Sequence, residues 1–501
     1  MQANHPVPKL AAAAGPPLIL IHPPAVSKRF LPTRFLPYGM AVLSSYLKEH
    51  QVPVIQHDFL PDYLYDFPEA PDFHHPENTF PETELFSYLE GSSGSSRLAA
   101  FADRYIRRLD LDSGIYAFSI ISYHQFWGAL ILAKRLRALQ PAANIVFGGP
   151  FITIRPPAGI TRYGLADYWI KGSGEAPLLA LYRRHAHLGS TRLADIPGLV
   201  YFAGVELKVN PTSRLAASRE RPPDFAGLSL DAYRYDHPVT GPQTLFLPYR
   251  FSRGCPSQCS FCTGCLVDRY SLKPVDKIMV ELQGLSACYG SSAFMFADAA
   301  INGSPRQLAA VCRRLPQELP EIRWYAYARI RGFTPELLQM AARAGCMSLF
   351  WGLESAHQPT VDFLGKGFQV AQVREIIDAS RAAGIKNYIH FMYNTPHETE
   401  ADLQALIRLV QHYRGCDDVY FMPMRFLLEP QSRLFEDPGA FGLQDLTRAP
   451  GSALDREAYI FSEVNGLEAP AIARRNRKHG EILAAVLAEI DAHRPPWGEY
   501  L

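Results

Sequence analysis

Three cysteines on one short stretch constrain this chain more than any other feature of its sequence. They stand in Cys255-Pro-Ser-Gln-Cys259-Ser-Phe-Cys262, with three and then two residues between them. A loop of this spacing brings three thiolates together, and groups of thiolates hold iron–sulfur clusters in proteins. Three thiolates ligate three irons of a 4Fe–4S cube and leave the fourth iron open to another molecule. We therefore expect a 4Fe–4S cluster on Cys255, Cys259 and Cys262.

A fourth cysteine, Cys265, leaves a zinc site with four thiolates as a second interpretation. Structural zinc sites usually separate two Cys-x-x-Cys pairs by about a dozen residues or more, whereas these four cysteines lie within eleven residues. Scattered buried cysteines are a third and weaker interpretation. We expect Cys265 to be a loop thiol, because a fourth thiolate on the open iron would oppose binding of another molecule there.

Composition and charge exclude several classes of partner. The 501 residues suffice for two or three domains, and 50 basic against 49 acidic residues give a net charge of +1, so nothing indicates a nucleic-acid partner. No apolar run reaches the roughly 18–20 residues of a membrane span. The first residues lack the basic region and apolar core of a signal peptide. Eight cysteines, half of them clustered, indicate a metal site in a reducing compartment, so we expect a cytoplasmic protein.

The first two hundred residues alternate between predicted strands and helices. Apolar runs at 18–21, 52–58, 115–119, 144–147 and 168–170 predict strands, and amphipathic helices follow several of them. Residues 70–96 are rich in Pro, Glu, Gly and Ser and predict a long surface excursion. We expect a doubly wound parallel α/β domain over residues 1–205, then a linker over 206–244 that crosses the surfaces of both domains.

The alternation restarts near residue 245 with longer helices. Six predicted strands at 245–251, 293–297, 323–328, 348–351, 387–393 and 418–425 predict an incomplete TIM-type (β/α)6 barrel over 245–428, with chemistry at the carboxyl ends of its strands. Asp298, Asn302, Arg329, Glu354 and Thr399 follow those ends. Some also have structural interpretations: Asp298 and Thr399 as helix caps, and Glu354 as a buried partner of Arg329. Residues 429–501 predict a small helical C-terminal region.

The cysteine loop, with Phe251-Ser-Arg-Gly254 ahead of it and Phe261 before its last cysteine, strongly resembles the cluster loop of radical S-adenosylmethionine (SAM) enzymes. In that family the open iron chelates SAM. The resemblance implies that SAM contacts Phe261, Asp298, Arg329, Gly352, Glu354, Ser355, Asn394 and Pro396. In related enzymes the fifth-strand motif reads Gly-x-Pro-Gly-Glu-Thr, whereas Asn394 and His397 replace the glycines here. The backbone of this loop is therefore an open question, and both side chains become candidates for contact with substrate.

Two glycine turns in the first domain carry a second resemblance. Gly148-Gly149-Pro150-Phe151 follows the fourth predicted strand and Gly172-Ser-Gly174-Glu175 follows the fifth. Each alone is an ordinary tight turn, but together and in this order they resemble the Rossmann-like cobalamin-binding domain found ahead of many radical SAM barrels. The resemblance implies cobalamin contacts from Pro24, Tyr38, Ser119, Tyr123, Gly148, Gly149, Pro150, Phe151, Gly172, Gly174 and Glu175.

Two absent motifs refine this expectation. Cobalamin domains that bind cobalt through histidine carry Asp-x-His-x-x-Gly after the first strand, and His22-Pro-Pro-Ala-Val lacks it, so we expect no histidine on cobalt. The Gly-x-Gly-x-x-Gly pattern of dinucleotide sites is also missing after that strand.

Together, the resemblances imply a cobalamin-dependent radical SAM methyltransferase that acts on an unactivated carbon of a small molecule or peptide. It would need an external electron donor of the flavodoxin or ferredoxin type. Two alternatives stay open: the same cofactors used for a radical cyclisation or rearrangement, and a cobalamin or iron–sulfur sensor without catalysis. A methylthiotransferase is disfavoured, because those enzymes carry further cluster cysteines near the amino terminus and no cysteine here precedes Cys255.

Overall fold

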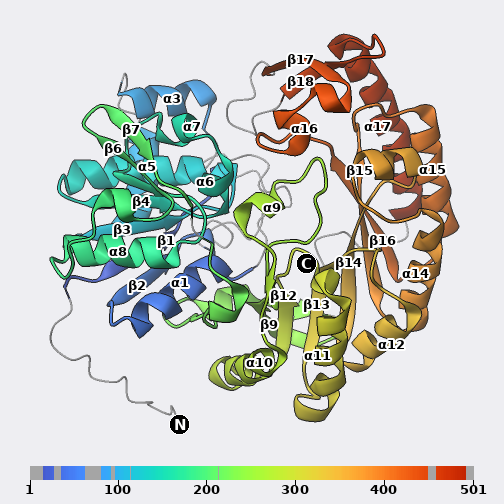
Figure 1. The fold of residues 1–501 in the computed structure, drawn as a ribbon, viewed down its shortest axis with the longest axis horizontal. Coiled ribbons are helices and arrows are strands. Elements are labelled where there is room, and N and C mark those ends of the chain that lie inside the picture. The colour runs from blue at the N-terminus through green and yellow to red at the C-terminus, as the bar shows by residue number, and fades with distance from the viewer. Residues whose placement is uncertain are drawn as a thin grey trace.

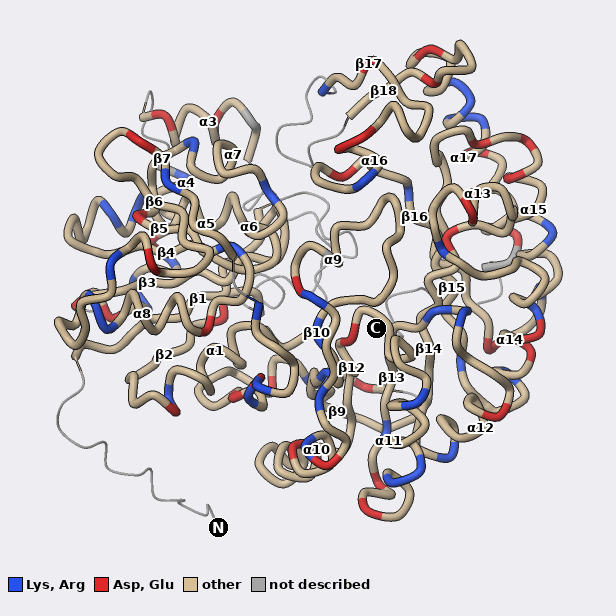
Figure 2. The backbone as a smooth tube through the Cα atoms, viewed as in Figure 1, with Lys and Arg blue, Asp and Glu red and all other residues tan. Residues whose placement is uncertain are grey.

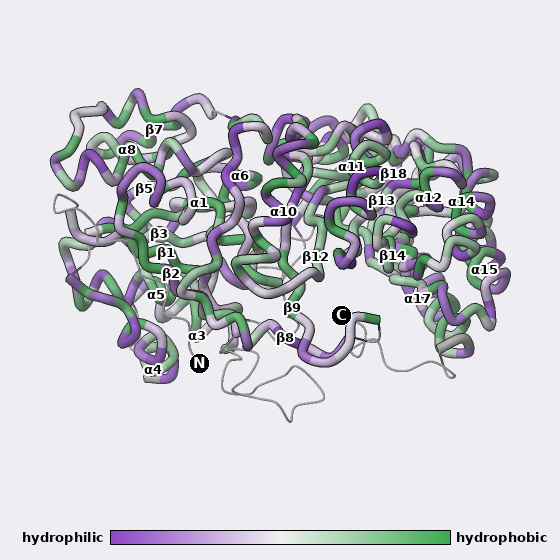
Figure 3. The backbone as a smooth tube through the Cα atoms, turned by 90° about the horizontal axis from the view of Figure 1, so that it is seen from below, coloured by the Kyte–Doolittle hydropathy of each residue, from purple (hydrophilic) through white to green (hydrophobic). Residues whose placement is uncertain are grey.

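The computed structural model describes residues 15–26, 35–61, 80–91, 96–112, 114–212, 214–237, 239–448 and 459–491. Two seven-stranded sheets lie side by side, each covered by helices (Figure 1). Seen from below, hydrophobic segments run through the middle of the first domain, around β1 (Leu18–His22), β2 (Val54–Asp58) and β3 (Ile115–Ser119) (Figure 3). Across the described residues, no helix combines the length and apolar character needed to cross a membrane.

The first sheet has the strand order β2-β1-β3-β4-β5-β6-β7. Its five parallel strands are β1 (Leu18–His22), β2 (Val54–Asp58), β3 (Ile115–Ser119), β4 (Asn144–Gly148) and β5 (Tyr168–Ile170). An antiparallel hairpin of β6 (Leu199–Ala203) and β7 (Glu206–Val209) extends it. The order 2-1-3-4-5 is that of a doubly wound fold, as the alternating pattern predicted. However, β7 lies in the segment expected to be linker and is part of this sheet.

Helices cover both faces of the first sheet. Alternate residues of β1 are therefore buried on opposite sides of the sheet. α1 (Tyr38–Glu49) and α8 (Glu175–His185) pack over Leu18 and Leu20. The other face, over Ile19 and Ile21, is covered by α3 (Glu82–Glu90), α4 (Ser96–Ile106), α5 (Tyr123–Leu139), α6 (Pro150–Ile154) and α7 (Pro157–Thr161).

Helix α3 corrects the expectation of a surface excursion over residues 70–96. Leu85 and Leu89, four residues apart, fall on one face of the helix and are buried in the core. The Pro, Glu and Ser residues around them obscured this short amphipathic pattern. Residues 70–79 and 92–95 of that stretch lie outside the described residues.

The second sheet has the order β16-β15-β14-β13-β12-β9-β8 and is curled into a half-barrel. Its six parallel strands are β9 (Gly241–Tyr249), β12 (Ala293–Phe296), β13 (Arg323–Ala328), β14 (Cys346–Glu354), β15 (Lys386–Tyr393) and β16 (Val419–Arg425). The prediction of six β/α units is therefore confirmed. β8 (Arg234–His237) pairs antiparallel with β9, so the second half of the expected linker also belongs to a sheet.

Five long helices cover the outer face of this sheet: α10 (Val275–Tyr289), α11 (Pro305–Glu318), α12 (Pro335–Arg343), α14 (Ala371–Ala382) and α15 (Glu400–His412). Short elements frame the cysteine loop and the strand ends: β10 (Ser252–Arg253), α9 (Gly264–Val267), β11 (Ser271–Leu272) and α13 (Gln358–Phe363). Single 3-10 turns occur at Leu193–Asp195, Ala217–Arg219, Leu230–Tyr233, Ile301–Gly303 and Gly439–Phe441.

The sequence predicted a helical C-terminal region. The structure differs, because this region also contains a β-hairpin. It consists of α16 (Arg433–Glu436), the antiparallel pair β17 (Leu443–Arg448) and β18 (Tyr459–Glu463), and α17 (Ala469–Asp491). Helix α17 lies beside α15 at the edge of the barrel (Figure 1). The hairpin alternates weakly in hydropathy, which hid its strands.

The segment between the sheets is fastened to both domains. The side-chain amide of Gln56, on β2, donates 2.9 Å to the carbonyl oxygen of Asp224. The next residue, Phe225, is buried in the barrel core, and its N–H donates 2.8 Å to the hydroxyl of Tyr289 on α10. The connector therefore contacts both domains, although Phe225 is buried in the barrel core and does not lie on its surface.

The turn after β4 depends on a glycine. Gly149 has φ 101° and ψ 177°, a region that only glycine occupies readily, and a Cβ there would lie 2.5 Å from the carbonyl oxygen of Ile120. Gly149→Ala should therefore lower the free energy of unfolding by about 3–5 kcal/mol in urea denaturation. The control is Gly164→Ala, at φ 58° with no atom within 4 Å of its Cβ, which should cost only about 1 kcal/mol. Equal losses would contradict the close approach at Ile120.

Candidate active site

The cysteine loop follows β9 at the carboxyl end of the half-barrel, where barrel enzymes carry their chemistry. Cys255, Cys259 and Cys262 are each partly exposed. Among the side chains that the structure describes, no three His, Cys, Asp or Glu converge as the ligands of a single ion would. A 4Fe–4S cube would take one thiolate on each of three irons, and ligation by Cys255, Cys259 and Cys262 stays a prediction. The side chain of Cys265, in α9, lies outside the described part.

Asp298 shapes the backbone immediately before the cysteines. Its carboxylate is 2% exposed and accepts hydrogen bonds from the N–H groups of Phe251, at 2.9 Å, and Ser252, at 2.7 Å. Burial raises the pKa of Asp298 to about 6, although these hydrogen bonds act to lower it. Asp298 therefore caps no helix but anchors the end of the first barrel strand. Its contact with SAM stays a prediction.

Two further regions of the chain hold the middle of the loop. Ser260 donates through its N–H to the carbonyl oxygen of Leu364, at 3.0 Å, and its own carbonyl accepts from the N–H of Leu434, at 2.9 Å. Arg329, predicted to contact SAM, donates 2.5 Å to the hydroxyl of Ser257 within the loop. The loop is thus held by the barrel on one side and by α16 of the C-terminal region on the other.

Glu354 does not pair with Arg329, so that structural interpretation is wrong. Its carboxylate instead lies 3.1 Å from the ammonium group of Lys366, and both side chains are largely buried. A Cβ on Gly352 would lie 3.0 Å from Glu354 Oε1 and 3.2 Å from Lys366 Nζ, so the glycine makes room for this ion pair. Lys366 Nζ also lies 6.0 Å from the ring centroid of Phe261.

Sequence reasoning missed Lys366. The available signal was its position between Gly365 and Gly367, which both adopt positive φ and turn the chain back toward the loop.

The loop after the fifth barrel strand lacks the two glycines of the related motif, but its backbone adopts a conformation typical of glycine at both positions. Asn394 has φ 67° and His397 has φ 58°, both in the left-handed region. The side chain of His397 faces the C-terminal region, with Nε2 2.8 Å from the carbonyl oxygen of Phe441, which does not favour its expected role near substrate. Thr399 caps α15 in a capping box, as its structural interpretation predicted.

The remaining predicted SAM residues differ in their surroundings. The hydroxyl of Ser355 accepts a hydrogen bond from the N–H of His357, at 3.1 Å, which fixes the turn after β14. Asn394 is largely buried, and within the described part of the chain its side-chain oxygen has no hydrogen-bond partner. Pro396 is buried in the same loop. Contacts of all three with SAM stay predictions.

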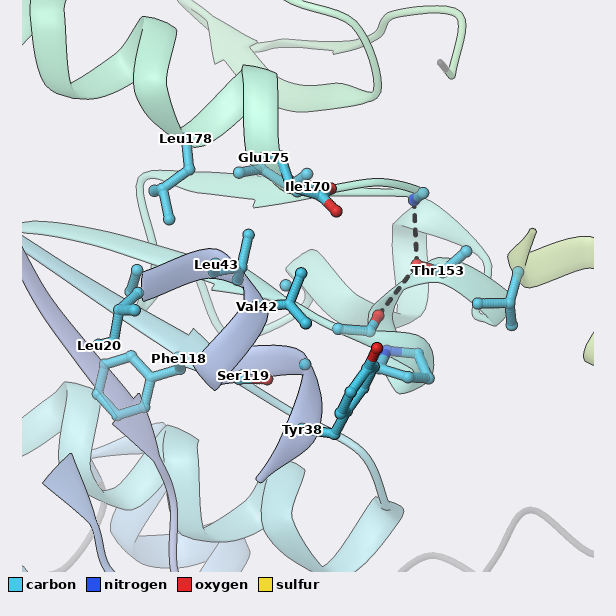
Figure 4. A pocket seen from close by; sticks show the side chains of 18 of the residues that line it. Leu20, Tyr38, Val42, Leu43, Phe118, Ser119, Thr153, Ile170, Glu175 and Leu178 are labelled. Atoms are coloured by element: carbon cyan, nitrogen blue, oxygen red, sulfur yellow. Dashed lines mark hydrogen bonds between the residues drawn. The ribbon is translucent and has the colours of Figure 1, made fainter. Parts of the chain in front are cut away.

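A pocket of about 880 Å³, including its open mouth, lies at the carboxyl ends of the parallel strands of the first sheet. It opens between α1 and α8 (Figure 4). The structure brings eight of the eleven predicted cobalamin residues together in its lining: Tyr38, Ser119, Gly148, Gly149, Pro150, Gly172, Gly174 and Glu175. Tyr123 and Phe151 line a different cavity, and Pro24 lies against Gly128 on α5.

Thr153 links the two glycine turns. Its hydroxyl donates to the carbonyl oxygen of Gly149 and accepts from the N–H of Gly172, both at 3.0 Å (Figure 4). The first bond is the i−4 contact that threonine makes within a helix. The second bond links the segment after β4 to the turn after β5, so this one side chain fixes the distance between the two turns. The position of Thr153 four residues after Gly149 was the only sequence signal for this role.

Residues that immediately surround the cysteine loop also line this pocket. Arg250, Arg253 and Asp268 contribute to its wall, and Arg253 stands two positions before Cys255. Arg253 lies 2.8 Å from Glu175 of the first domain and 3.2 Å from Asp268. Charged residues of both signs gather in this region, near β10 (Figure 2). The pocket and the cysteine loop are therefore joined by one buried ion-pair network.

Glu220, in the connector, is the centre of that network. It is 0% exposed and lies 2.9 Å from Arg250, 3.3 Å from Lys273 and 3.5 Å from Arg253, and it accepts 2.7 Å from the hydroxyl of Tyr38. Burial alone would raise the pKa of Glu220, but the three cations outweigh it and lower the pKa to about 2. No sequence pattern indicated this residue.

His22 is not available as a ligand in the pocket. It is 2% exposed, and its Nδ1 lies 2.8 Å from Asp58 while its Nε2 lies 2.7 Å from the side-chain amide nitrogen of Gln125. Both ring nitrogens are thus used within the domain. This agrees with the expectation that no histidine after β1 binds cobalt.

The comparison with known families decides what the barrel is. The sequence profile of the Radical SAM superfamily matches residues 249–410, which begin at the end of β9 and include all three cysteines. Residues 249–410 therefore form a radical SAM domain.

Several proteins are similar to this chain over longer stretches. An uncharacterized methyltransferase of Pyrococcus horikoshii is 24% identical over 404 residues, 79% of this chain and 77% of that protein. An anaerobic magnesium-protoporphyrin IX monomethyl ester cyclase of Cereibacter sphaeroides is 26% identical over 279 residues. The match covers 54% of this chain and 44% of the cyclase, so the chain spans less than half of that relative's length.

Two solved structures share the fold. The radical SAM methyltransferase TsrM from Kitasatospora setae, solved with tryptophan substrate and a SAM analogue, superposes with a TM-score of 0.65 at 17% identity. That match covers 96% of this chain and 92% of TsrM. The cobalamin-dependent SAM radical enzyme OxsB, solved with aqua-cobalamin, superposes with a TM-score of 0.61 at 17% identity over 85% of this chain and 56% of OxsB.

The charge network predicts a pH dependence. A carboxyl whose pKa is lower in the folded chain stabilises the fold above its ordinary pKa of 4.5 and loses this contribution as the pH falls toward 2. Glu220→Gln should lower the melting temperature at pH 7, because Arg250 loses its buried counter-charge, and should flatten the loss of stability between pH 4.5 and about 2.

Thermal unfolding followed by circular dichroism across this pH range checks the prediction. Asp195→Asn, in an exposed pair with Arg192, is the control and should retain the wild-type profile. A Glu220→Gln profile parallel to that of the wild type would show that Glu220 is not the group responsible.

Proposed function

We propose that this radical SAM protein is a cobalamin-dependent methyltransferase, which transfers a methyl group from SAM to an unactivated carbon of a small molecule or peptide. One observation carries the proposal. The pocket at the carboxyl end of the first sheet shares its wall with Arg253, two residues before the first cysteine of the loop. A cofactor in that pocket would therefore lie next to the chemistry of the loop. Two proteins with the same fold support the same assignment: TsrM, a radical SAM methyltransferase solved with cobalamin and a 4Fe–4S cluster, and OxsB, a cobalamin-dependent SAM radical enzyme.

The cysteine loop fits a 4Fe–4S cluster. Cys255, Cys259 and Cys262 would hold it, and the cluster, when bound, supplies an electron and an open iron for SAM. Lys366 and Arg329 bring two cationic groups to the same side of the barrel, where they would offset the negative charge of the thiolates. Ser260 and Asp298, through their hydrogen bonds, fix the loop that presents the thiolates.

The polarity of the pocket lining suits cobalamin. Apolar side chains of α1, α8, β1 and β5 line it. Gly39 also lines it and leaves open space, because a Cβ added there would have no atom within 4 Å. Glu175 Oε2 and Asp268 Oδ1 are buried at this pocket and have no hydrogen-bond partner among the described residues. Two acceptors of this kind suit the amide N–H groups that surround a corrin ring. Cobalamin, when bound there, supplies the methyl group that reaches the substrate.

The proposed reaction balances over two molecules of SAM. One SAM, with one electron, yields methionine and 5′-deoxyadenosine, which carries away one hydrogen atom of the substrate. The second SAM, with another electron, gives its methyl group in place of that hydrogen and leaves as S-adenosylhomocysteine. Both electrons come from the external donor. Closing the site between two domains keeps the substrate radical away from water and from other groups.

Anaerobic turnover with trideuteromethyl-SAM tests the proposal. The reconstituted protein, with cobalamin and a chemical reductant, should release both 5′-deoxyadenosine and S-adenosylhomocysteine, and a methylated product should carry the trideuteromethyl group. Cys259→Ser should lose most of the cluster iron and at least about 100-fold in 5′-deoxyadenosine formation, because its thiolate no longer holds an iron, while it retains cobalamin binding.

The outcomes separate the alternatives. 5′-Deoxyadenosine with a product of unchanged carbon count would favour a radical cyclisation or rearrangement, which is the activity named for the Cereibacter sphaeroides relative. Formation of neither SAM product would leave only the sensor interpretation standing.

Cys265 is expected to stand outside the cluster. Cys265→Ser should retain cluster iron and 5′-deoxyadenosine formation within about twofold of the wild type, because three thiolates suffice for a cube with one open iron. Iron analysis and quantification of 5′-deoxyadenosine measure both quantities. Loss of either would identify Cys265 as a ligand and would contradict an open fourth iron.

A further inference from the structure

A second cavity lies on the opposite face of the first sheet, among α5, α6, α7 and the C-terminal hairpin. The space inside it, including its open mouth, is about 870 Å³. None of the residues that line it lines the cobalamin pocket. The two cavities are separated by α6: Pro150 and Thr153 belong to one, and Phe151 and Arg155 to the other. The second cavity is therefore a separate site.

Its walls are aromatic. Seven of the lining residues are Phe, Tyr or Trp, and they come from both the first domain and the hairpin. Trp127 is at their centre, with its ring centroid 5.6 Å from Phe86, 5.7 Å from Tyr123 and 6.0 Å from Tyr163. These pairs are edge-to-face, an arrangement that packs rings firmly. Walls of this kind favour a flat apolar body.

Two buried donors in this wall lack an acceptor. Trp127 is 4% exposed, and neither its Nε1 nor the hydroxyl of Tyr163 has a hydrogen-bond partner within the described residues. A buried polar group without a partner costs free energy. A ligand that brings an acceptor atom to either donor would remove this cost.

The charged residues of the cavity are all basic. Arg155, Arg162 and Arg448 line it, and no acidic residue occurs in its described lining. Arg155 is buried, packs over the ring of Phe151 at 5.0 Å and lies 3.4 Å from Glu429, behind the lining. Arg162 and Arg448 are exposed, and Arg162 lies 3.7 Å from Glu90, which is outside the lining. Guanidinium groups recognise carboxylates with two parallel hydrogen bonds, so the mouth is suited to an anionic group.

From these observations we propose that the second cavity binds a flat aromatic molecule that carries a carboxylate. The ring system packs among the aromatic walls. The carboxylate accepts hydrogen bonds from Trp127 and Tyr163 and is attracted by Arg448 at the mouth. Binding here requires neither SAM nor cobalamin, so the proposal goes beyond methyl transfer and can fail without affecting it.

A matched pair of probes tests the site on the full chain. Isothermal calorimetry should show that 2-naphthoate binds at least about tenfold more tightly than the neutral 2-naphthylmethanol, because only the carboxylate meets the donors and the arginines. Saturating aquacobalamin should not displace the naphthoate. Equal affinity for the two probes, or displacement by aquacobalamin, would overturn the proposal.

Two variants distinguish a binding role from a structural one. Tyr163→Phe should weaken naphthoate binding about tenfold and leave the melting temperature equal or higher, because the lost hydroxyl has no partner in the fold. The control is Tyr182→Phe, which removes another buried hydroxyl without a partner, outside both cavities, and should not change the affinity. Arg448→Gln should weaken naphthoate about tenfold and leave 2-naphthylmethanol unchanged. Naphthoate affinity that survives both Tyr163→Phe and Arg448→Gln would overturn the proposal.

Discussion

The buried attraction between Glu175 and Arg253 is the contact on which the rest of the arrangement depends. One partner begins α8 in the first domain, and the other stands two residues before the cysteine loop. With Glu220 and Arg250 they form a network from which water is largely excluded. Removal of one member of such a pair typically costs about 3–5 kcal/mol, because it leaves the other charge buried alone. The two domains therefore cannot separate without exposing charges that were matched to each other.

This ion-pair network holds the first domain next to the cysteine loop. Parallel strands end at one edge of a doubly wound sheet, and that edge opens between α1 and α8 onto the barrel. Thr153 fixes the two turns at the edge, and Arg253 and Asp268 complete the wall from the other domain. A pocket built in this way exists only when both domains are in place. The pairing of two sheets in one rigid unit is thus a requirement of the site itself.

Local signals predicted the parts of the site that depend on backbone geometry. The cysteine spacing and the glycine turns act within a few residues, so their positions in the sequence carried over to the structure. Side chains that act across the fold could not be found in this way. Glu220 lies in a connector without periodicity, and its partners are 30 or more residues away. Lys366 and Thr153 are single residues whose roles exist only once distant strands meet.

The same difference between local and long-range signals applies to the fold. Long amphipathic helices and buried parallel strands were predictable because their periodicity is strong. Helix α3 and the hairpin β17–β18 were not, because each is short and half exposed. Tertiary packing decides such segments, and it overrides their weak local preferences.

The hydrogen bond between Ser260 and Leu434 has a consequence for assembly in the cell. It joins the cysteine loop to a segment made 174 residues later, so the loop acquires this support only after the ribosome has added those residues. Contacts between residues so distant in sequence form late, since the intervening chain must first be ordered. Iron delivery during synthesis would meet an unfinished loop. The geometry therefore favours a chain that is loaded with its cluster after translation.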